Sequence, residues 1–401
     1  MNKVKESLWT KPFVLLILSN LFLFLSLEML LPTLPMFAAN KGGSDAEIGL
    51  IIGLFTFSAV LLRPFVGMAS DKFGKKLLLL VGVAICLIGT ASYYAAVTIT
   101  MMLMLRIVHG VGFGISTTLY GTVASDIIPA SRRGEGMGFF GTGNAVAISL
   151  GPFLGIWLME EFGFSVLFIV GACILLIAMV CTAFVKGDTK EERAKAQIAS
   201  ATETSFMLRF IEPKALMPSL LGLLVGLSLG GVISFITLFG KETGVQNIGF
   251  FFLVLAISEF LIRFISGRIF DSKGRFWVLF PAAISCIVGC IILYMTKSTG
   301  TLLLAAVFYG AGFGAIFPGL QAWVIDRVEP QRRGVATATF YNAFDIGIGS
   351  GAMLLGLVAT WSNYATMYLV SSLFFVIYLV VYFIYEKQLK QAGLAKIVKR
   401  S

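Results

Sequence analysis

An internal repeat constrains the fold of this chain more than any other feature of its sequence. A cluster of charged residues and glycines recurs 200 positions later in the same order. The first copy is Arg63, Gly67, Asp71 and Gly74, and the second is Arg263, Gly267, Asp271 and Gly274. The same spacing relates the glycines at 110–114 to those at 310–314, and Arg132-Arg133-Gly134 to Arg332-Arg333-Gly334. The repeat predicts two halves built on one template.

Composition places both halves in a membrane. The 401 residues are 58% hydrophobic and only 13% charged, whereas about a quarter of the residues in a soluble domain are charged. A helix needs roughly 20 apolar residues to span a bilayer, and continuous apolar runs do not fit the alternating strands of a β-barrel. We expect twelve spanning helices, at about 13–39, 46–69, 77–96, 98–124, 133–159, 164–185, 214–240, 246–269, 276–296, 300–325, 332–359 and 363–385.

The basic residues predict the orientation, because Lys and Arg favour cytoplasmic loops. If both termini are cytoplasmic, only Lys41, Lys241 and Lys297 of the 31 Lys and Arg lie outside the cell. We expect a multi-pass protein of the cell membrane, with a cytoplasmic linker at 186–213 and residues 40–45 outside. The positive charge follows the loops, so it does not indicate a nucleic-acid partner. The five cysteines fall inside apolar spans, and neither a disulfide nor a metal site is expected.

The turn after the second span reads Gly67-x-x-x-Asp71-x-x-Gly74-Lys75-Lys. Gly67 allows close helix packing, Asp71 can accept hydrogen bonds from helix N-termini, and Gly74 permits a positive φ. The pattern resembles the Gly-x-x-x-Asp-x-x-Gly-Arg-Lys signature of the major facilitator superfamily, with Lys75 in place of Arg. We expect Gly67, Asp71, Gly74 and the second copy's Asp271 to act as a conformational latch between two helix bundles.

The fourth span contains Arg106-Ile-Val-His109-Gly-Val-Gly. It resembles the Arg-x-x-Gln-Gly-x-Gly signature of the drug/proton antiporter branch, with His109 where Gln is usual. Position 306 is Ala, so the repeated scaffold does not need Arg106, and a functional role is favoured. His109 has two open roles, as a direct participant or as a packing group.

The fifth span resembles the antiporter motif Gly-x-x-x-Gly-Pro-x-x-Gly-Gly at Gly151, Pro152 and Gly155, but has Ala147 and Ile156 at two glycine positions. The glycines let helices approach closely, and the proline weakens the local hydrogen-bond ladder. Glycine packing with no bearing on transport direction is the alternative interpretation.

Two acids stand out inside apolar spans, where charge is costly. Glu28 precedes two prolines in the first span, and Asp345 in the eleventh corresponds to Ala145 in the first half, so we expect an unpaired acid that favours cationic substrates or a second proton. Burial favours a neutral Glu28, whereas a nearby Arg106 would favour its carboxylate, so we predict that Glu28, Arg106 and Asp345 couple transport to protons.

Other polar residues complete the predicted site. The substrate cavity is expected to be lined by Glu28, His109, Asn144, Tyr341, Asn342 and Asp345. Glu259 and Arg263 lie one helical turn apart and are expected to form a structural pair.

The resemblance implies an all-α membrane fold of two six-helix bundles related by pseudo-two-fold symmetry. We assign residues 1–185 to the first bundle, 186–213 to the linker and 214–401 to the second bundle. The expected function is proton-coupled export of a small, partly apolar compound, with an uptake symporter or uniporter as the alternative. No catalytic array or phosphate loop is present, so we predict a transporter and not an enzyme, without a cofactor, acting as a monomer on a small molecule and protons.

Overall fold

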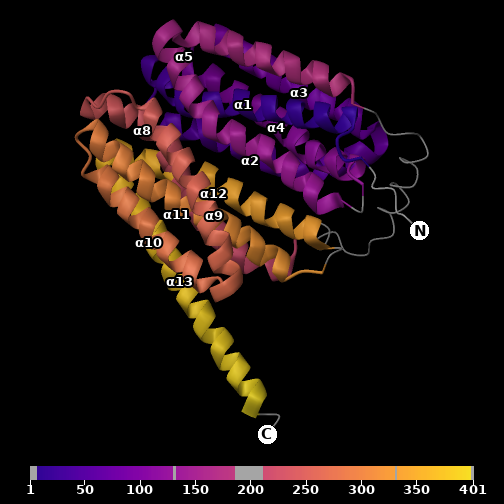
Figure 1. The fold of residues 1–401 in the computed structure, drawn as a ribbon. Helices are drawn as coiled ribbons and strands as arrows, with labels where there is room; N and C mark the ends of the chain where they lie inside the picture. Colours follow the sequence, from indigo (N-terminus) through magenta and orange to yellow (C-terminus); the bar gives the residue numbers. More distant parts are fainter. Residues whose placement is uncertain (1–6, 130–131, 186–210, 330–331, 399–401) are drawn as a thin grey trace.

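The computed structural model describes residues 7–129, 132–185, 211–329 and 332–398. Long helices make up nearly all of these ranges (Figure 1). They are α1 (Lys11–Asn40), α2 (Asp45–Phe73), α3 (Lys75–Ser92), α4 (Ile99–Ile127), α5 (Arg133–Ala183), α8 (Leu216–Thr243), α9 (Gly249–Lys273), α10 (Phe276–Tyr294), α11 (Thr299–Asp326), α12 (Arg333–Trp361) and α13 (Tyr364–Val398), with short 3₁₀ turns η1 (Tyr93–Ala95) and η3 (Pro213–Ala215).

The longest helix, α5, contains two membrane spans. Its 51 residues would extend about 77 Å if straight, more than twice the roughly 30 Å hydrocarbon core of a bilayer. Gly163 breaks it with φ 80° and ψ 173°, a conformation that side-chain-bearing residues rarely adopt. Figure 1 shows α5 doubling back there. The described ranges contain eleven long apolar helices. Because α5 accounts for two spans, these helices make twelve spans, and the prediction is confirmed.

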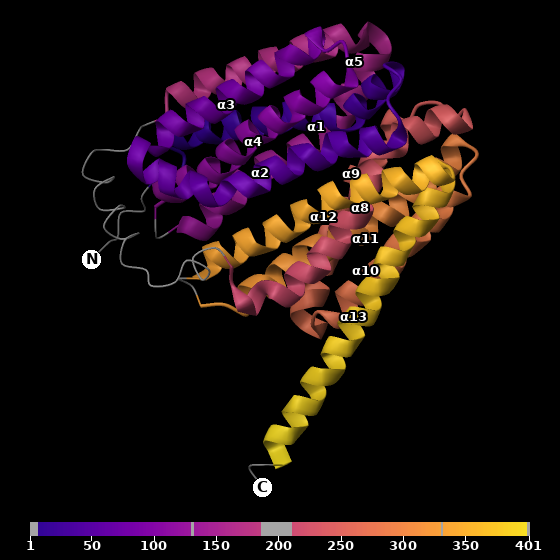
Figure 2. The ribbon, with the colours of Figure 1, turned by 180° about the vertical axis from the view of Figure 1, so that it is seen from behind.

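The helix boundaries follow local signals in the sequence. Thr10 and Ser44 cap the starts of α1 and α2 with their side chains, and Ser44 forms a reciprocal capping box with Glu47. Gly74, at the turn between α2 and α3, has the positive φ expected for it, 92°. The last helix differs from the prediction, because α13 continues past the predicted end at 385 and projects from the bundle (Figure 2).

The helices form two groups, α1–α5 and α8–α13, which lie side by side (Figures 1 and 2). Between the groups, α2 packs along α12, the first part of α5 packs along α9, and α1 reaches α8. Glycine makes the α2–α12 contact possible, because a Cβ on Gly49 would lie 2.5 Å from the carbonyl oxygen of Ala352.

Several contacts join the two halves at one end of the molecule. We call the end where α1 begins, the second part of α5 ends and η3 begins the linker end, and the opposite one the far end. At the far end the Thr237 hydroxyl donates to the Pro32 carbonyl at 2.9 Å, the Tyr364 hydroxyl donates to Asp45, and the rings of Phe153 and Phe250 lie 5.9 Å apart. Polar and aromatic contacts therefore join the halves there.

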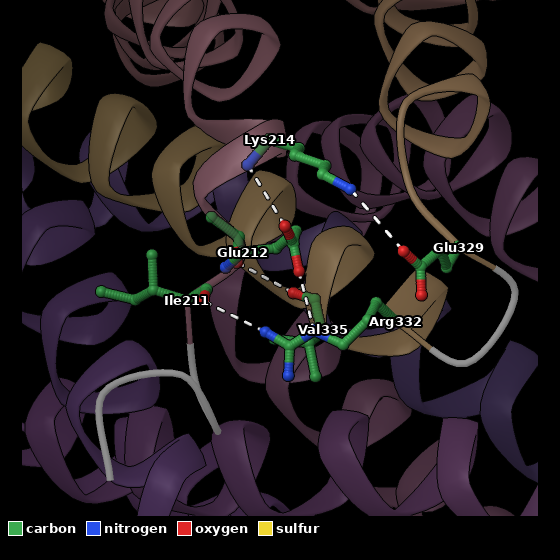
Figure 3. A network of polar contacts seen from close by, with 7 residues as sticks. Ile211, Glu212, Lys214, Glu329, Arg332 and Val335 are labelled. Carbon is green, nitrogen blue, oxygen red and sulfur yellow. Dashed lines mark hydrogen bonds and ion pairs between the residues drawn. The ribbon is translucent and has the colours of Figure 1, made fainter. Parts of the chain in front are cut away.

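The C-terminal side of the linker is fixed to the second half. Of the predicted linker 186–213, residues 186–210 lie outside the described part of the chain, and 211–213 approach the turn before α12 (Figure 3). Glu212 accepts a hydrogen bond from Arg332 Nε at 2.8 Å, and its own backbone N–H donates to Thr339 at 3.0 Å. Burial raises the pKa of Glu212, but hydrogen bonds from Arg332 and the Lys214 backbone outweigh it and hold the pKa below its ordinary value.

Candidate functional site

Glu28 lies among buried apolar residues of α1, between Leu27 and Met29, and is only 9% exposed. The glycines of the fifth-span motif pack directly on it, because a Cβ on Gly151 would collide with the Glu28 side chain and one on Gly155 with the backbone of Met29. Pro152 between them is buried. Sequence analysis did not predict that the motif and this acid form one helix contact, since nothing in the spacing relates α1 to α5.

The Glu28 carboxyl has no compensating partner in the described part of the chain. Among the described residues, none forms a hydrogen bond or an ion pair with it. A buried acid without a partner is costly when ionised, so this environment favours a protonated Glu28.

Arg106, expected beside Glu28, is instead directed towards α2. It is fully buried, its Nε donates to the Ile51 carbonyl at 2.9 Å, and its guanidinium lies 4.2 Å from the centre of the Phe55 ring. Within the described chain its Nη1 and Nη2 have no hydrogen-bond partner, although Tyr93 faces the guanidinium. The structure therefore places a cation with two unbonded donor nitrogens inside the first half.

His109 packs on the same side of α4. Its Nδ1 lies 3.3 Å from the Tyr93 hydroxyl, and its ring meets the Phe55 ring edge-on at 5.4 Å. Only 2% of the residue is exposed. These contacts match the packing alternative left open by the sequence.

Asp345 is paired, so the expectation of an unpaired acid is wrong. Arg63 Nη2 lies 2.6 Å from Asp345 Oδ2, and Arg63 Nη1 donates to Asn342 Oδ1 at 2.7 Å. The partner was missed because Arg63 belongs to the other half and reaches Asp345 only where α2 packs along α12. One feature of the sequence indicates that Arg63 needs a partner from elsewhere. Arg263 follows an acid, Glu259, by one helical turn, whereas Arg63 has no acid at the equivalent position.

The predicted pair on α9 is confirmed. Arg263 Nη2 lies 3.3 Å from Glu259 Oε2, with Glu259 7% and Arg263 40% exposed. On α12, the Tyr341 hydroxyl accepts a hydrogen bond from Gln321 at 2.6 Å.

Asn144, another expected cavity residue, joins two helices of the first half. Its side-chain oxygen accepts a hydrogen bond from Asn20, and it is partly buried. This contact ties α5 to α1 on the linker side of Glu28.

The predicted latch is only partly visible. The Asp71 side chain lies outside the described residues, and Asp271 is exposed. Among the described residues, a Cβ on Gly67 would meet nothing within 4 Å, so the close packing expected at Gly67 is not seen there in this conformation. On the neighbouring turns, Lys75 and Asp126 form an ion pair at 2.5 Å.

A hollow in the surface of the first half lies away from these charged residues. It has a volume of about 430 Å³ and is lined by Leu87, Ala91, Tyr94, Phe168, Ile169, Ala172, Cys173 and Leu176. These residues belong to α3, its following turn and α5, and include well-exposed Tyr94 and Ile169. Because its lining is apolar and it opens on the outer surface, it does not coincide with the charged residues above.

Comparison with known proteins agrees with this arrangement. A protein of Methanocaldococcus jannaschii described as an uncharacterised MFS-type transporter is 23% identical over 88% of this chain and 92% of its own length. The multi-drug resistance efflux pump PmrA of Streptococcus pneumoniae is 24% identical over 87% of this chain and 89% of its own length. A bacterial homologue of the human lysosomal transporter Spinster, solved in an inward-facing, occupied conformation, has a TM-score of 0.76 at 16% identity, covering 94% of this chain and 96% of that one.

The profile of the Major Facilitator Superfamily matches residues 16–303 and 220–398, which together cover most of the chain. The fold and the repeat agree with that match. The protein is therefore a membrane transporter, not an enzyme, and belongs to the Major Facilitator Superfamily.

Proposed function

We propose that the protein is a proton-coupled antiporter of the cell membrane, exporting a small, partly apolar organic compound by alternating access. The observation that carries this proposal is Glu28, a carboxyl buried in an apolar helix, without a partner among the described residues, against Gly151 of the antiporter-like motif. Buried ionisable groups inside membrane helices mark ion and substrate pathways.

Proton coupling follows from the environment of Glu28. In a closed, apolar surrounding Glu28 holds a proton, because burial penalises its ionised form. When the helices around it separate, water stabilises the carboxylate and the proton leaves. A substrate that binds best beside the ionised carboxylate then competes with the proton, which is the exchange that antiport requires.

Relatives support export as the direction. PmrA is named as a multi-drug resistance efflux pump, and the match to it spans most of both chains. The second candidate is an uptake symporter or uniporter, favoured by the incomplete fifth-span motif with Ala147 and Ile156. Transport of labelled compounds in inverted and right-side-out vesicles distinguishes the two directions.

The decisive experiment removes the Glu28 charge. We expect Glu28→Gln to abolish gradient-driven export and the proton release that follows substrate addition to detergent-solubilised protein, while the protein stays folded. Glu160→Gln is the matched control, because Glu160 is an exposed acid just before the Gly163 break in α5. Proton release by the Glu28→Gln variant equal to that of the parent would show that Glu28 is not the coupling residue.

The proposed orientation places both termini and the linker in the cytoplasm. In a cysteine-free background, a cysteine at exposed Lys41 should react with an impermeant reagent in intact cells. Labelling only after the cells are broken open would reverse the orientation.

A further inference from the structure

A second hollow adjoins the one at Leu87 and Tyr94, along the seam where α3 and the second part of α5 lie side by side (Figures 1 and 2). It has a volume of about 410 Å³. Its lining is apolar and consists of Leu80, Val81, Ala84, Met179, Val180 and Ala183. The two hollows follow one another, because Ala84 of one lies a single helical turn before Leu87 of the other. Together they extend about 21 Å along α3, from Leu80 to Tyr94.

This seam faces the bilayer. Val81 and Val180 on its two sides are 41% and 49% exposed. Both belong to membrane-spanning helices, so lipid is the solvent that surrounds them. One leaflet contributes about half of the roughly 30 Å hydrocarbon core, or about 15 Å. The seam is therefore long enough to hold an acyl chain over its whole length.

The internal repeat shows how the second half fills the equivalent seam, between α10 and α13. There the Phe276 ring stacks on Phe280 at 5.3 Å and on Tyr382 at 6.4 Å. The Phe383 ring packs edge-on against Phe280 at 5.4 Å. The equivalent residues of the first half are Lys76, Leu80, Thr182 and Ala183. None of these four carries a ring, so the space that aromatic side chains fill in the second half is open in the first.

The two seams also differ in charge at the linker end. In the second half Arg275 is neutralised by Glu386, with 2.7 Å between Nη2 and Oε1. Position 186 is Lys where 386 is Glu, so the first half lacks that acid. Lys76 lies one helical turn before Leu80 on the same face of α3. Within the described chain the Lys76 ammonium forms no hydrogen bond or ion pair, so a cation stands at the entrance of the hollow without a partner.

We propose that this seam binds an acyl chain of an anionic phospholipid, and that the Lys76 ammonium binds the phosphate of its headgroup. The phospholipid belongs to the leaflet at the linker end, where α3 begins and the second part of α5 ends. An anionic headgroup fits better than a zwitterionic one, because a zwitterion carries its own ammonium beside the phosphate. The site is separate from Glu28, and the inference does not depend on the direction of transport.

Two phospholipids with identical chains test the proposal: dioleoyl phosphatidylglycerol and dioleoyl phosphatidylcholine. Each is titrated onto delipidated full-length protein in detergent, and binding is measured by native mass spectrometry and by the shift of the thermal unfolding midpoint. We expect phosphatidylglycerol to bind about fivefold more tightly, the contribution of one lysine at a membrane surface. Glycerol phosphate, which has the charged group without the chains, should leave the midpoint unchanged.

Two variants separate the charge from the hollow. Lys76→Gln should abolish the preference for phosphatidylglycerol and leave phosphatidylcholine binding unchanged. Ala84→Ile combined with Ala183→Phe introduces the residues of the second half, Ile284 and Phe383. Because the larger side chains fill the hollow, this double variant should weaken both phospholipids about tenfold, as the loss of one or two buried methylene contacts does.

Lys273→Gln is the matched control, since it removes an exposed lysine from the corresponding turn of the second half. It should bind both phospholipids as the parent does. The midpoint without lipid reports whether each variant is folded, and Ala183→Phe alone replaces the double variant if that variant does not fold.

Three results would overturn the proposal. A preference for phosphatidylglycerol that persists in Lys76→Gln, or is lost equally in Lys273→Gln, would exclude Lys76 as the headgroup contact. Unchanged binding of both phospholipids in the folded, filled variant would exclude the seam as the chain site. A midpoint raised by glycerol phosphate as much as by phosphatidylglycerol would show that the chains contribute nothing.

Discussion

Arg63 and Arg263 occupy equivalent positions in the two halves, yet one binds residues of the other half and the other binds a residue of its own helix. Arg63 crosses to the other half and bonds Asp345 and Asn342, whereas Arg263 bonds Glu259 on its own helix. The sequence accounts for both, since position 59 is Ala where 259 is Glu, and position 145 is Ala where 345 is Asp. The same cation thus stabilises the interface in one half and stays accessible in the other.

The two halves also differ in the hydrogen bonding of the polar residues inside each bundle. In the second half Tyr309 bonds Ser228 at 3.1 Å, and Ser228 bonds Ser371 at 2.7 Å, which closes the network. The equivalent region of the first half has His109 in place of Tyr309 and Arg106 in place of Ala306, with two unused guanidinium donors. The polar groups around Tyr309 are therefore hydrogen-bonded to one another, whereas the equivalent place in the first half holds a guanidinium that is incompletely bonded in this conformation.

The largest effect is expected at Arg106. Arg106→Ala should reduce gradient-driven export at least about tenfold, as the loss of a coupling residue does. Its unfolding midpoint should not fall, because Ala306 fills the equivalent place and two unpartnered buried donors are removed. Vesicle transport and a thermal melt in detergent measure the two quantities. A strong loss of stability together with transport would make Arg106 structural and end the contrast between the halves.

The next effect is expected at the pair between the halves. Arg63→Ala should cost about 1–3 kcal/mol, less than for a fully buried pair because Arg63 and Asp345 are 18% and 22% exposed. A double-mutant cycle with Asp345→Ala isolates the coupling from other losses. A coupling energy near zero would mean that the pair does not stabilise the interface.

A smaller effect is expected at the intrahelical pair. The cycle of Arg263→Ala with Glu259→Ala should give about 0.3–0.5 kcal/mol, as other pairs one turn apart with an exposed member do. The informative quantity is its ratio to the Arg63–Asp345 coupling. If the two cycles agree, the different partners of the two arginines have no energetic consequence.

A modest effect, in the stabilising direction, is expected at the two signature glycines. Gly67 and Gly267 both face open space, so Ala at either position should raise stability by at most about 1 kcal/mol through helix propensity. If the latch closes on Gly67 in another conformation, Gly67→Ala should also slow export. Unchanged export in both variants would remove the latch from the mechanism.

The spans, the break within α5, the caps and the Glu259–Arg263 pair could all be predicted, because each depends on residues close together in sequence. The pairing of Asp345 could not, since it depends on α2 reaching α12 across the halves. Likewise, the contact of Gly151 with Glu28 depends on which helices become neighbours. The direction of the Arg106 guanidinium, towards Ile51 and Phe55, is set by packing that spacing along one helix does not determine.

The bond from Thr237 to Pro32 places Glu28 near a fulcrum. Glu28 lies one turn from that bond, about 6 Å along the helix axis, whereas the start of α1 lies about 30 Å from it. If the halves rotate about this point, a displacement of about 10 Å at the linker end moves Glu28 by only about 2 Å. In such a rotation the helix segments farther from the Thr237–Pro32 bond move much more than the Glu28 carboxyl. The surroundings of the carboxyl therefore change more than its position.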